Sequence, residues 1–454
     1  MPAEPAVVSG AADRKELSLV VYNDNLALVR ETRRVNLPDG KFDLRLAGIG
    51  RMLLPSSVIA EPGGGIELIE QRYLYNPLNR SNLLEAYIGR KVLIERENER
   101  TGELERREAV LLTNDGGPVV EVDGEVLLEP GGKLILPQLP EGLVAEPVLS
   151  WLLESGSAGT RDIGLSYLTN GLSWQSEYVL TLGPGEGRAV LSGWVSLHNR
   201  SGADFRNARL HLIAGSINRA SRQQYAFAPE MIEMRASLAA KADMGGMPPQ
   251  AQFEYYRYDL PHRMDLLHNQ VKQVELFAAR QIRVEKIYRF SGSSRYFHAP
   301  VRPQREPVPA DVILEWHSGG ADDKDLPLPA GLVRVYDKDA SGTTWFAGED
   351  RIGHTPAGEK VTVSAGRAFD VKGLRRQLDF QRPTDRLRRV TLEIELINTK
   401  DITVTVQIDE PIPGDWKITA SSHDWEKLES NLVRFEPRVK AGSRVNVRYT
   451  IEFI

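Results

Sequence analysis

The chain has 454 residues, of which 41% are hydrophobic and 26% charged, so it is long enough for about three domains with well-buried cores. A formal net charge of -5 excludes the strongly basic surface that nucleic-acid-binding proteins carry. Cysteine is absent, which excludes disulfide bonds, thiolate metal sites and a cysteine nucleophile.

The first 80 residues predict a disordered tail followed by an N-terminal β region. Residues 1–15 are rich in Pro, Ala and Gly and predict the tail. From residue 16 to 80 we expect short strands, the first two at Leu17–Tyr22 and Leu26–Leu37. The pair Asp39-Gly40 is typical of a hairpin turn.

Residues 81–143 predict a small β-barrel that is preceded by a short helix. Asn82–Ile88 is the helix candidate, and Gly89 after it is a typical C-cap. The strands that follow are short and closely spaced, with turns at Asp115–Gly117 and Asp123-Gly124. This spacing is typical of a small barrel.

Residues 148–320 predict a β-sandwich, since apolar and polar residues alternate along its strands. Trp174 and Tyr178 occupy alternate positions of one strand, and Trp194 and Ser196 occupy alternate positions of the next. Residues 221–252 lack this alternation and predict an exposed insertion, helical or disordered, between two strands. Pro229 suits the first turn of its short amphipathic helix.

Residues 321–454 predict a second, C-terminal β-sandwich. Two strands around the turn Asp337–Gly342 indicate a hairpin. In the last strand, Arg444–Ile454, apolar residues alternate strictly with polar ones, which is typical of a half-buried antiparallel strand. The expected fold is therefore mainly β and multi-domain: a barrel-like N-terminal region, then two immunoglobulin-like sandwiches.

The hairpin turn Asp337–Gly342 resembles the first half of a calcium-binding loop. Asp337, Asp339 and Ser341 stand at alternate positions before Gly342. A complete loop of this kind would carry Glu at its twelfth position, where this chain has Gly348. Because Asp and Gly also suit a tight hairpin, the sequence favours a turn over a calcium site.

Methionine gathers in and just after the insertion, with His262 and His268 nearby in the sequence. Thioether ligands select Cu(I), so a copper site is one interpretation. A Met-rich helix face that packs on a partner is a second, and a plain surface loop is a third. The methionines concerned are Met231, Met234, Met244, Met247 and Met264.

An aromatic run follows the insertion and has two interpretations. Its rings can stack on sugars, but consecutive tyrosines of a strand face opposite sides of a sheet, which favours ordinary packing. The run consists of Phe253, Tyr255, Tyr256 and Tyr258, with Arg257 between them.

Glu349, Asp350 and His354 lie close together in the sequence, and a carboxylate–histidine pair can do acid–base chemistry. The same side chains can instead hold a turn by hydrogen bonds. The chain has no G-x-S-x-G, H-E-x-x-H or G-x-x-x-x-G-K-[ST] motif, so the turn is favoured.

Several spaced blocks of the sequence occur together in a characteristic order: VYNDNLALVRETRRVNLPDG, LSYLTNGLSWQSEYVLTL, LSGWVSLHNRSGADFRNARLHLIAG, LPAGLVRVYDKDASG, FAGEDRIGHTPAGE and GRAFDV. These blocks resemble a bacterial family, the domain of unknown function 4139 proteins, which are related to the mucoidy-inhibitor A proteins. The resemblance covers most of the chain from about Leu17 and implies a mostly β, often exported protein, without established catalytic residues.

Together these features predict a non-enzymatic structural or interaction protein of the bacterial cell envelope. We assign no catalytic, cofactor-binding or metal-binding residue, and we expect no cofactor. The expected partner is a protein or an envelope component, and not a nucleic acid. The alternative is a hydrolase or metal-dependent enzyme with a site near the Glu349–His354 block.

The resemblance implies the cell envelope or periplasm, and the cytoplasm is the alternative location. The opening MPAEPAVVSGAADRKEL has no apolar h-region, so we do not expect it to act as a signal peptide. No apolar run approaches the roughly 20 residues that span a bilayer, and we expect no transmembrane segment.

Overall fold

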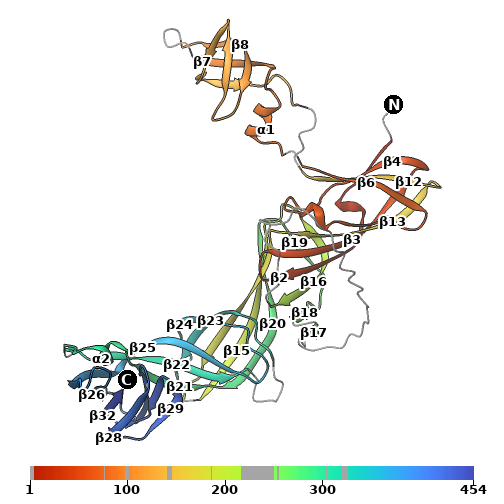
Figure 1. Ribbon diagram of the computed structural model, residues 1–454. Coiled ribbons are helices and arrows are strands. Elements are labelled where there is room, and N and C mark those ends of the chain that lie inside the picture. The colour runs from red at the N-terminus through yellow and green to blue at the C-terminus, as the bar shows by residue number, and fades with distance from the viewer. Residues whose placement is uncertain are drawn as a thin grey trace. The chain divides into compact units, whose positions relative to one another are not determined.

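A computed structural model describes residues 5–75, 77–97, 102–140, 146–185, 187–215, 250–252, 255–302, 304–318 and 326–454. The protein is mainly β, as the alternation of apolar and polar residues predicted (Figure 1). It divides into two compact units, each built from segments that are distant in the sequence. Unit 1 comprises Met1–Trp174, Leu197–Ile213 and Asp259–Lys272, and unit 2 comprises Gln175–Ser196, Ala214–Tyr258 and Gln273–Ile454.

Two sheets form the main body of unit 1. The first has the strand order β1 (Ala6–Ser9), β4 (Gly40–Leu46), β12 (Val148–Ser155), β6 (Ile66–Leu74). The second contains β16 (Phe205–Ala214), β2 (Arg14–Tyr22), β3 (Leu26–Leu37), β13 (Gly159–Thr169) and β5 (Ile59–Glu61), with β19 (Met264–Leu266) paired to β16. The short 3-10 helices η1 (Ala11–Asp13) and η2 (Pro55–Ser57) connect strands of these sheets.

The N-terminal tail that we predicted to be disordered is partly a strand. From Ala6 to Ser9 it pairs in parallel with β4, and β2 begins at Arg14. The buried Arg33 donates from Nη1 to the carbonyl oxygens of Ser9, at 2.8 Å, and Ala47, at 2.9 Å. The prediction was wrong for this segment because its ordering depends on a guanidinium from a distant strand.

The guanidinium of Arg33 is itself neutralised inside the unit. It donates to Oε1 of Glu31 from Nε, at 2.9 Å, and from Nη2, at 2.6 Å. The other carboxylate oxygen of Glu31 contacts Arg14. Glu31 and Arg33 expose at most 1% of their surface, and buried charges of this kind persist only when they are paired.

One helix and five strands between Arg80 and Ile135 share a small apolar core of their own. The helix α1 (Arg80–Glu85) is capped by Asn79, whose side chain accepts the N–H of Asn82. Its antiparallel sheet has the order β10 (Glu125–Leu127), β9 (Val119–Val122), β8 (Leu104–Thr113), β7 (Lys91–Glu97), β11 (Lys133–Ile135). Within the described residues this order is an open path from β10 to β11, so the small barrel we expected is only partly formed.

A five-stranded sheet runs through the first part of unit 2. Its order is β20 (Gln270–Arg283), β15 (Arg188–Asn199), β14 (Leu172–Leu182), β23 (Gly331–Lys338), β24 (Thr344–Ile352). The predicted hairpin is confirmed, since β23 and β24 pair antiparallel. Strand β23 also pairs in parallel with β14, which lies some 150 residues earlier in the chain.

The C-terminal strands form a long sheet that folds over on itself. Its order is β28 (Trp416–Ser421), β32 (Arg444–Phe453), β26 (Arg388–Asn398), β25 (Lys360–Gln381), β22 (Val308–His317), β21 (Glu285–Ser291), β27 (Val404–Pro411), β30 (Leu432–Phe435), β29 (Trp425–Glu429). The two-residue strand β31 (Arg438–Val439) pairs with β27, and α2 (Arg295–His298) precedes β22.

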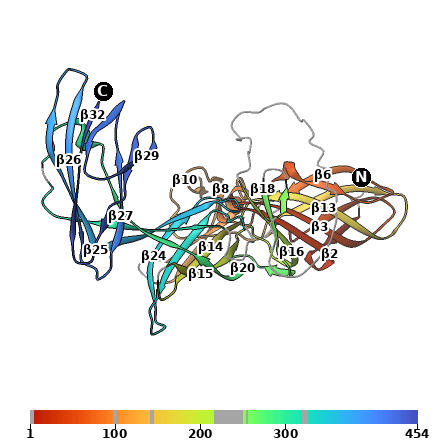
Figure 2. The same cartoon turned by 90° about the horizontal axis from the view of Figure 1, so that it is seen from below.

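Both halves of this sheet contribute to one apolar core. Figure 2 shows β26 and β32 beside each other, with β27 and β29 across from them. Rings from opposite halves meet, since the centroids of Phe435 on β30 and Tyr449 on β32 lie 5.1 Å apart. Strand β32 pairs with both β26 and β28, so the prediction of a half-buried C-terminal strand is confirmed.

Strand pairing corrects the predicted domain boundaries. The N-terminal strands do not form a region that ends at residue 80, because β3 pairs with β13 and β4 pairs with β12. The boundary at residue 320 is also wrong, because β21 and β22 join the C-terminal sheet while β23 joins β14. Alternation identifies strands, but it does not say which strands pair.

The predicted insertion lies almost entirely outside the described residues. Its last residues, Gln250–Gln252, form β17, which pairs antiparallel with β18 (Tyr255–Asp259). The methionines Met231, Met234, Met244 and Met247 lie outside the described residues, as does Phe253.

Candidate functional site

The side chains of Asp350 and His354, in the Glu349–His354 block, accept hydrogen bonds from backbone N–H groups. Both oxygens of Asp350 accept backbone N–H groups, one of them that of Ser364 at 2.8 Å. The Nδ1 atom of His354 accepts the N–H of Ala330 at 3.2 Å. An open groove of about 420 Å³ beside the β23–β24 turn is not lined by this block. These contacts match the interpretation that the side chains hold turns.

The Asp337–Gly342 segment is likewise organised as a turn. The Oδ1 atom of Asp339 accepts the hydroxyl of Ser341 at 2.6 Å and the N–H of Thr343 at 2.9 Å. These bonds, chiefly that from Ser341, lower the pKa of Asp339 below its usual value. Gly342 supplies the positive φ of 89° that the turn requires. Among the described residues, no group of three or more acidic or histidine side chains is arranged to hold a metal.

The histidines and tyrosines that follow the insertion have separate surroundings. His268 accepts the N–H of Gly202 at its Nδ1, at 3.2 Å. Tyr258 is buried and donates from its hydroxyl to the Pro327 carbonyl, at 3.1 Å, whereas Tyr256 is 37% exposed. The tyrosines therefore do not present one continuous stacking surface, and Tyr258 belongs to the interior.

A ladder of polar side chains crosses the five-stranded sheet, and we call it the central ladder. Its members come from all five strands: Gln273 on β20, Ser196 on β15, Glu177 on β14, Arg334 on β23 and Glu349 on β24. Glu177 Oε1 accepts the Ser196 hydroxyl at 3.0 Å, and its Oε2 accepts the Gln273 amide at 3.0 Å. Arg334 lies between the two carboxylates, 3.4 Å from Glu177 and 3.6 Å from Glu349.

The strand pattern explains why these side chains share a face. Along β14, Tyr178 and Leu180 are fully buried while Glu177 and Val179 alternate with them. The parallel register places Val179 beside Arg334, and the antiparallel register places Arg334 beside Glu349. The face opposite the buried one therefore carries the ladder.

Aromatic side chains flank the central ladder on the same face. Trp194 lies two residues before Ser196 on β15 and is 38% exposed. At the other side, Tyr336 lies two residues after Arg334, and its ring meets that of Phe346 edge-on at 5.7 Å. Phe346 is 59% exposed. We call Trp194, Tyr336, Phe346 and the central ladder the aromatic–polar face.

The sequence did not identify this face. Alternation in β15 singled out Trp194 and Ser196, but it did not show that their side of the strand faces away from the apolar core, where Trp194 is exposed and Ser196 is covered by its neighbours. The buried side is formed by Leu191, Val195 and Leu197. The available signal was the polar character of Ser196 beside an apolar alternating set, which indicates the outer face of a half-buried strand.

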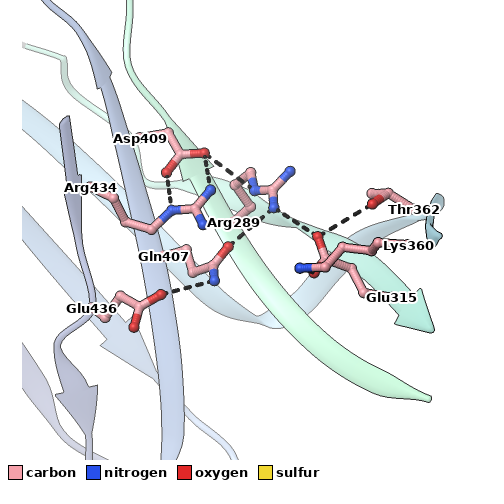
Figure 3. A network of polar contacts seen from close by, with 8 residues as sticks. All are labelled: Arg289, Glu315, Lys360, Thr362, Gln407, Asp409, Arg434 and Glu436. Atoms are coloured by element: carbon pink, nitrogen blue, oxygen red, sulfur yellow. Dashed lines mark hydrogen bonds and ion pairs between the residues drawn. The ribbon is translucent and has the colours of Figure 1, made fainter. Parts of the chain in front are cut away.

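A second ladder crosses the C-terminal sheet, as Figure 3 shows. Arg289 Nη2 lies 3.4 Å from Glu315, and Arg289 Nε lies 3.4 Å from Asp409. Asp409 accepts two bonds from Arg434, at 2.7 and 2.8 Å, and Glu315 accepts one from Lys360, at 2.9 Å. We call this set the outer ladder; its residues are Arg289, Glu315, Lys360, Thr362, Gln407, Asp409, Arg434 and Glu436.

The outer ladder links neighbouring strands of the sheet and has a structural role. Three basic side chains meet three carboxylates, so its charge is balanced. Most of its ionic groups are well covered, with side-chain exposures of 11% for Glu315, 13% for Asp409 and 21% for Arg289. Each of these groups already has an ionic partner, which leaves little charge for a ligand. We therefore regard the aromatic–polar face as the better binding candidate.

Comparison with protein-family models matches the chain to the domain of unknown function (DUF4139) over residues 163–452. The chain belongs to this family. The DUF4139 region contains all five members of the central ladder and the three aromatic residues beside it. A search of the curated proteins gives no match.

Among the described residues, no helix is long and apolar enough to cross a bilayer.

Proposed function

We propose that this DUF4139 protein is a non-enzymatic structural or interaction protein of the bacterial cell envelope, and that it binds a protein partner through the aromatic–polar face. The observation that carries the proposal is the composition of that face. Trp194 and Phe346 are exposed on a sheet whose other side is buried. Tryptophan, tyrosine and arginine are the residues most enriched at the energetic centres of protein interfaces.

The central ladder supports this proposal because it is pre-ordered. Glu177 accepts bonds from Ser196 and Gln273 on one side and contacts Arg334 on the other, and its side chain is only 16% exposed. Arg334 is fixed between two carboxylates, so little side-chain entropy remains to be lost on binding. With two carboxylates and one guanidinium the ladder is acidic by one charge, which favours a partner that presents a basic group.

The non-enzymatic part of the proposal is supported by the contacts of Asp350 and His354. Both side chains bind backbone N–H groups, and their neighbour Glu349 binds Arg334. The envelope location is supported by the resemblance of the sequence to a family that is often exported.

Site-specific photo-crosslinking in the producing bacterium tests the proposal. Ser192 lies on the same side of β15 as Trp194 and Ser196, so a photoreactive residue there reports what covers the face. We expect one discrete crosslinked protein, recovered with the envelope fraction. The double variant Trp194→Ala/Phe346→Ala should reduce the crosslink by about tenfold or more, since each lost anchor costs on the order of 1–2 kcal/mol.

Trp425→Ala is the matched control. Trp425 is an exposed tryptophan, 41% accessible, on β29 of the C-terminal sheet, and its loss should leave the crosslink unchanged. A crosslink that survives the double variant, or that disappears equally in Trp425→Ala, would show that another surface binds. A hydrolytic activity abolished by His354→Ala would favour an enzyme instead.

A further inference from the structure

Strand β6 is an end strand of its sheet with an unusual surface. In the described pairings it binds β12 on one side only. Most of its residues are exposed, including the apolar Leu68 (37%), Ile69 (44%) and Leu74 (43%). Its neighbour β12 is in contrast mostly buried, with Trp151 and Leu153 at 0%. Long apolar edges of this kind invite pairing with another strand, because their outer N–H and C=O groups have no strand beside them.

The sequence of the strand is complementary to itself. When two copies are aligned antiparallel with Gln71 opposite Gln71, Glu70 of each copy stands opposite Arg72 of the other. The same alignment brings Ile69 opposite Tyr73 and Leu68 opposite Leu74. Residues opposite each other in an antiparallel pair have side chains on the same face, so both ionic pairs form at once.

We propose that β6 pairs in this register with β6 of a second copy of the chain, which makes the first sheet of unit 1 continuous through a two-fold axis at Gln71. This surface lies in unit 1, whereas the aromatic–polar face lies in unit 2, so a failure of one proposal leaves the other untouched. Two-fold pairing of one patch with itself is the commonest closed symmetry of oligomers.

The charges on this strand are placed for such a pair. Arg72 lies 3.6 Å from Glu70 of its own strand and 3.4 Å from Asp43 of β4. Its side chain remains 43% exposed and that of Glu70 53% exposed, so both can turn toward a facing strand.

A β-bulge limits how far the new pairing extends. The register of β6 against β12 shifts between Leu152 and Leu153, which leaves Ile69 as the extra residue. Bulges bend an edge and reduce its pairing, and the new ladder is symmetric about Gln71, so its regular part runs from Glu70 to Arg72 in each copy. A contact of this size is small, and we expect a weak dimer whose population rises with protein concentration.

Sedimentation velocity of the full chain over a range of concentrations tests the proposal. Wild type should pass from monomer to dimer. Glu70→Arg and Arg72→Glu each place like charges opposite each other twice, and each should raise the dissociation constant by about tenfold or more. The double variant E70R/R72E restores opposite charges in the same register and should recover the dimer.

Ile59→Lys is the control for adding charge to an edge. Ile59 is 60% exposed on β5, the end strand of the other sheet, so this variant should dimerise like wild type. Circular dichroism checks that every variant is folded. The proposal would be overturned by a wild type that stays monomeric or by a dissociation constant that neither single substitution changes. A double variant that stays monomeric would also overturn it.

Discussion

The buried guanidinium of Arg33 should decide the stability of the first sheet of unit 1. Arg33→Met keeps a side chain of similar length but removes the donors to Glu31, Ser9 and Ala47. Breaking a buried ion pair by removing one partner costs about 3–5 kcal/mol. Because Glu31 keeps its contact with Arg14, we expect the lower end, about 3 kcal/mol. A domain is stable by only about 5–15 kcal/mol, so this is a large fraction.

Hydrogen exchange read by mass spectrometry, together with urea unfolding, measures the effect where it should occur. The amides of β1 should lose protection first, because Ser9 loses the donor that ties it to β3. Arg34→Met is the matched control, because Arg34 is the next residue in the chain and its side chain is exposed. The Arg34 guanidinium pairs with Asp162 on the surface and holds the pKa of Asp162 well below its usual range. Equal urea midpoints and equal protection of β1 in wild type and Arg33→Met would refute the reasoning.

Two further predictions concern the C-terminal sheet. Deleting the chain from Val445 removes four buried side chains of β32, worth about 6–12 kcal/mol together, so the sheet should unfold; a soluble product with an unchanged melting profile would contradict this. Glu315 should stabilise the fold above its ordinary pKa of 4.5 and progressively less as the pH falls through its lower folded value. Burial acts most strongly on this pKa and raises it, but the bond from Lys360 and the charges of Lys360 and Arg289 together outweigh burial. Glu315→Gln should therefore melt below wild type at pH 7, with the gap closing toward pH 3, and a gap independent of pH would exclude this role.

The location of many strands followed from the sequence, because side-chain alternation is a local property of the chain. The hairpin of β23 and β24 was predictable for the same reason, since its turn residues, Asp339 and Gly342, lie between its strands. The C-terminal strand was predictable because Val447, Tyr449 and Ile451 alternate with polar residues. The contacts of Asp350 and His354 also match the turn that the sequence favoured.

Pairing between distant strands was decided only by the tertiary structure. No local pattern shows that β23 pairs with β14, or that β3 pairs with β13, since alternation is the same for every partner. The ordered N-terminal strand depends on Arg33, a residue that sequence alone places on an ordinary strand. The sequence did not reveal the aromatic–polar face for the same reason. Its residues come from five strands, and only the pairing of these strands places Trp194, Glu177 and Arg334 on one side of the sheet.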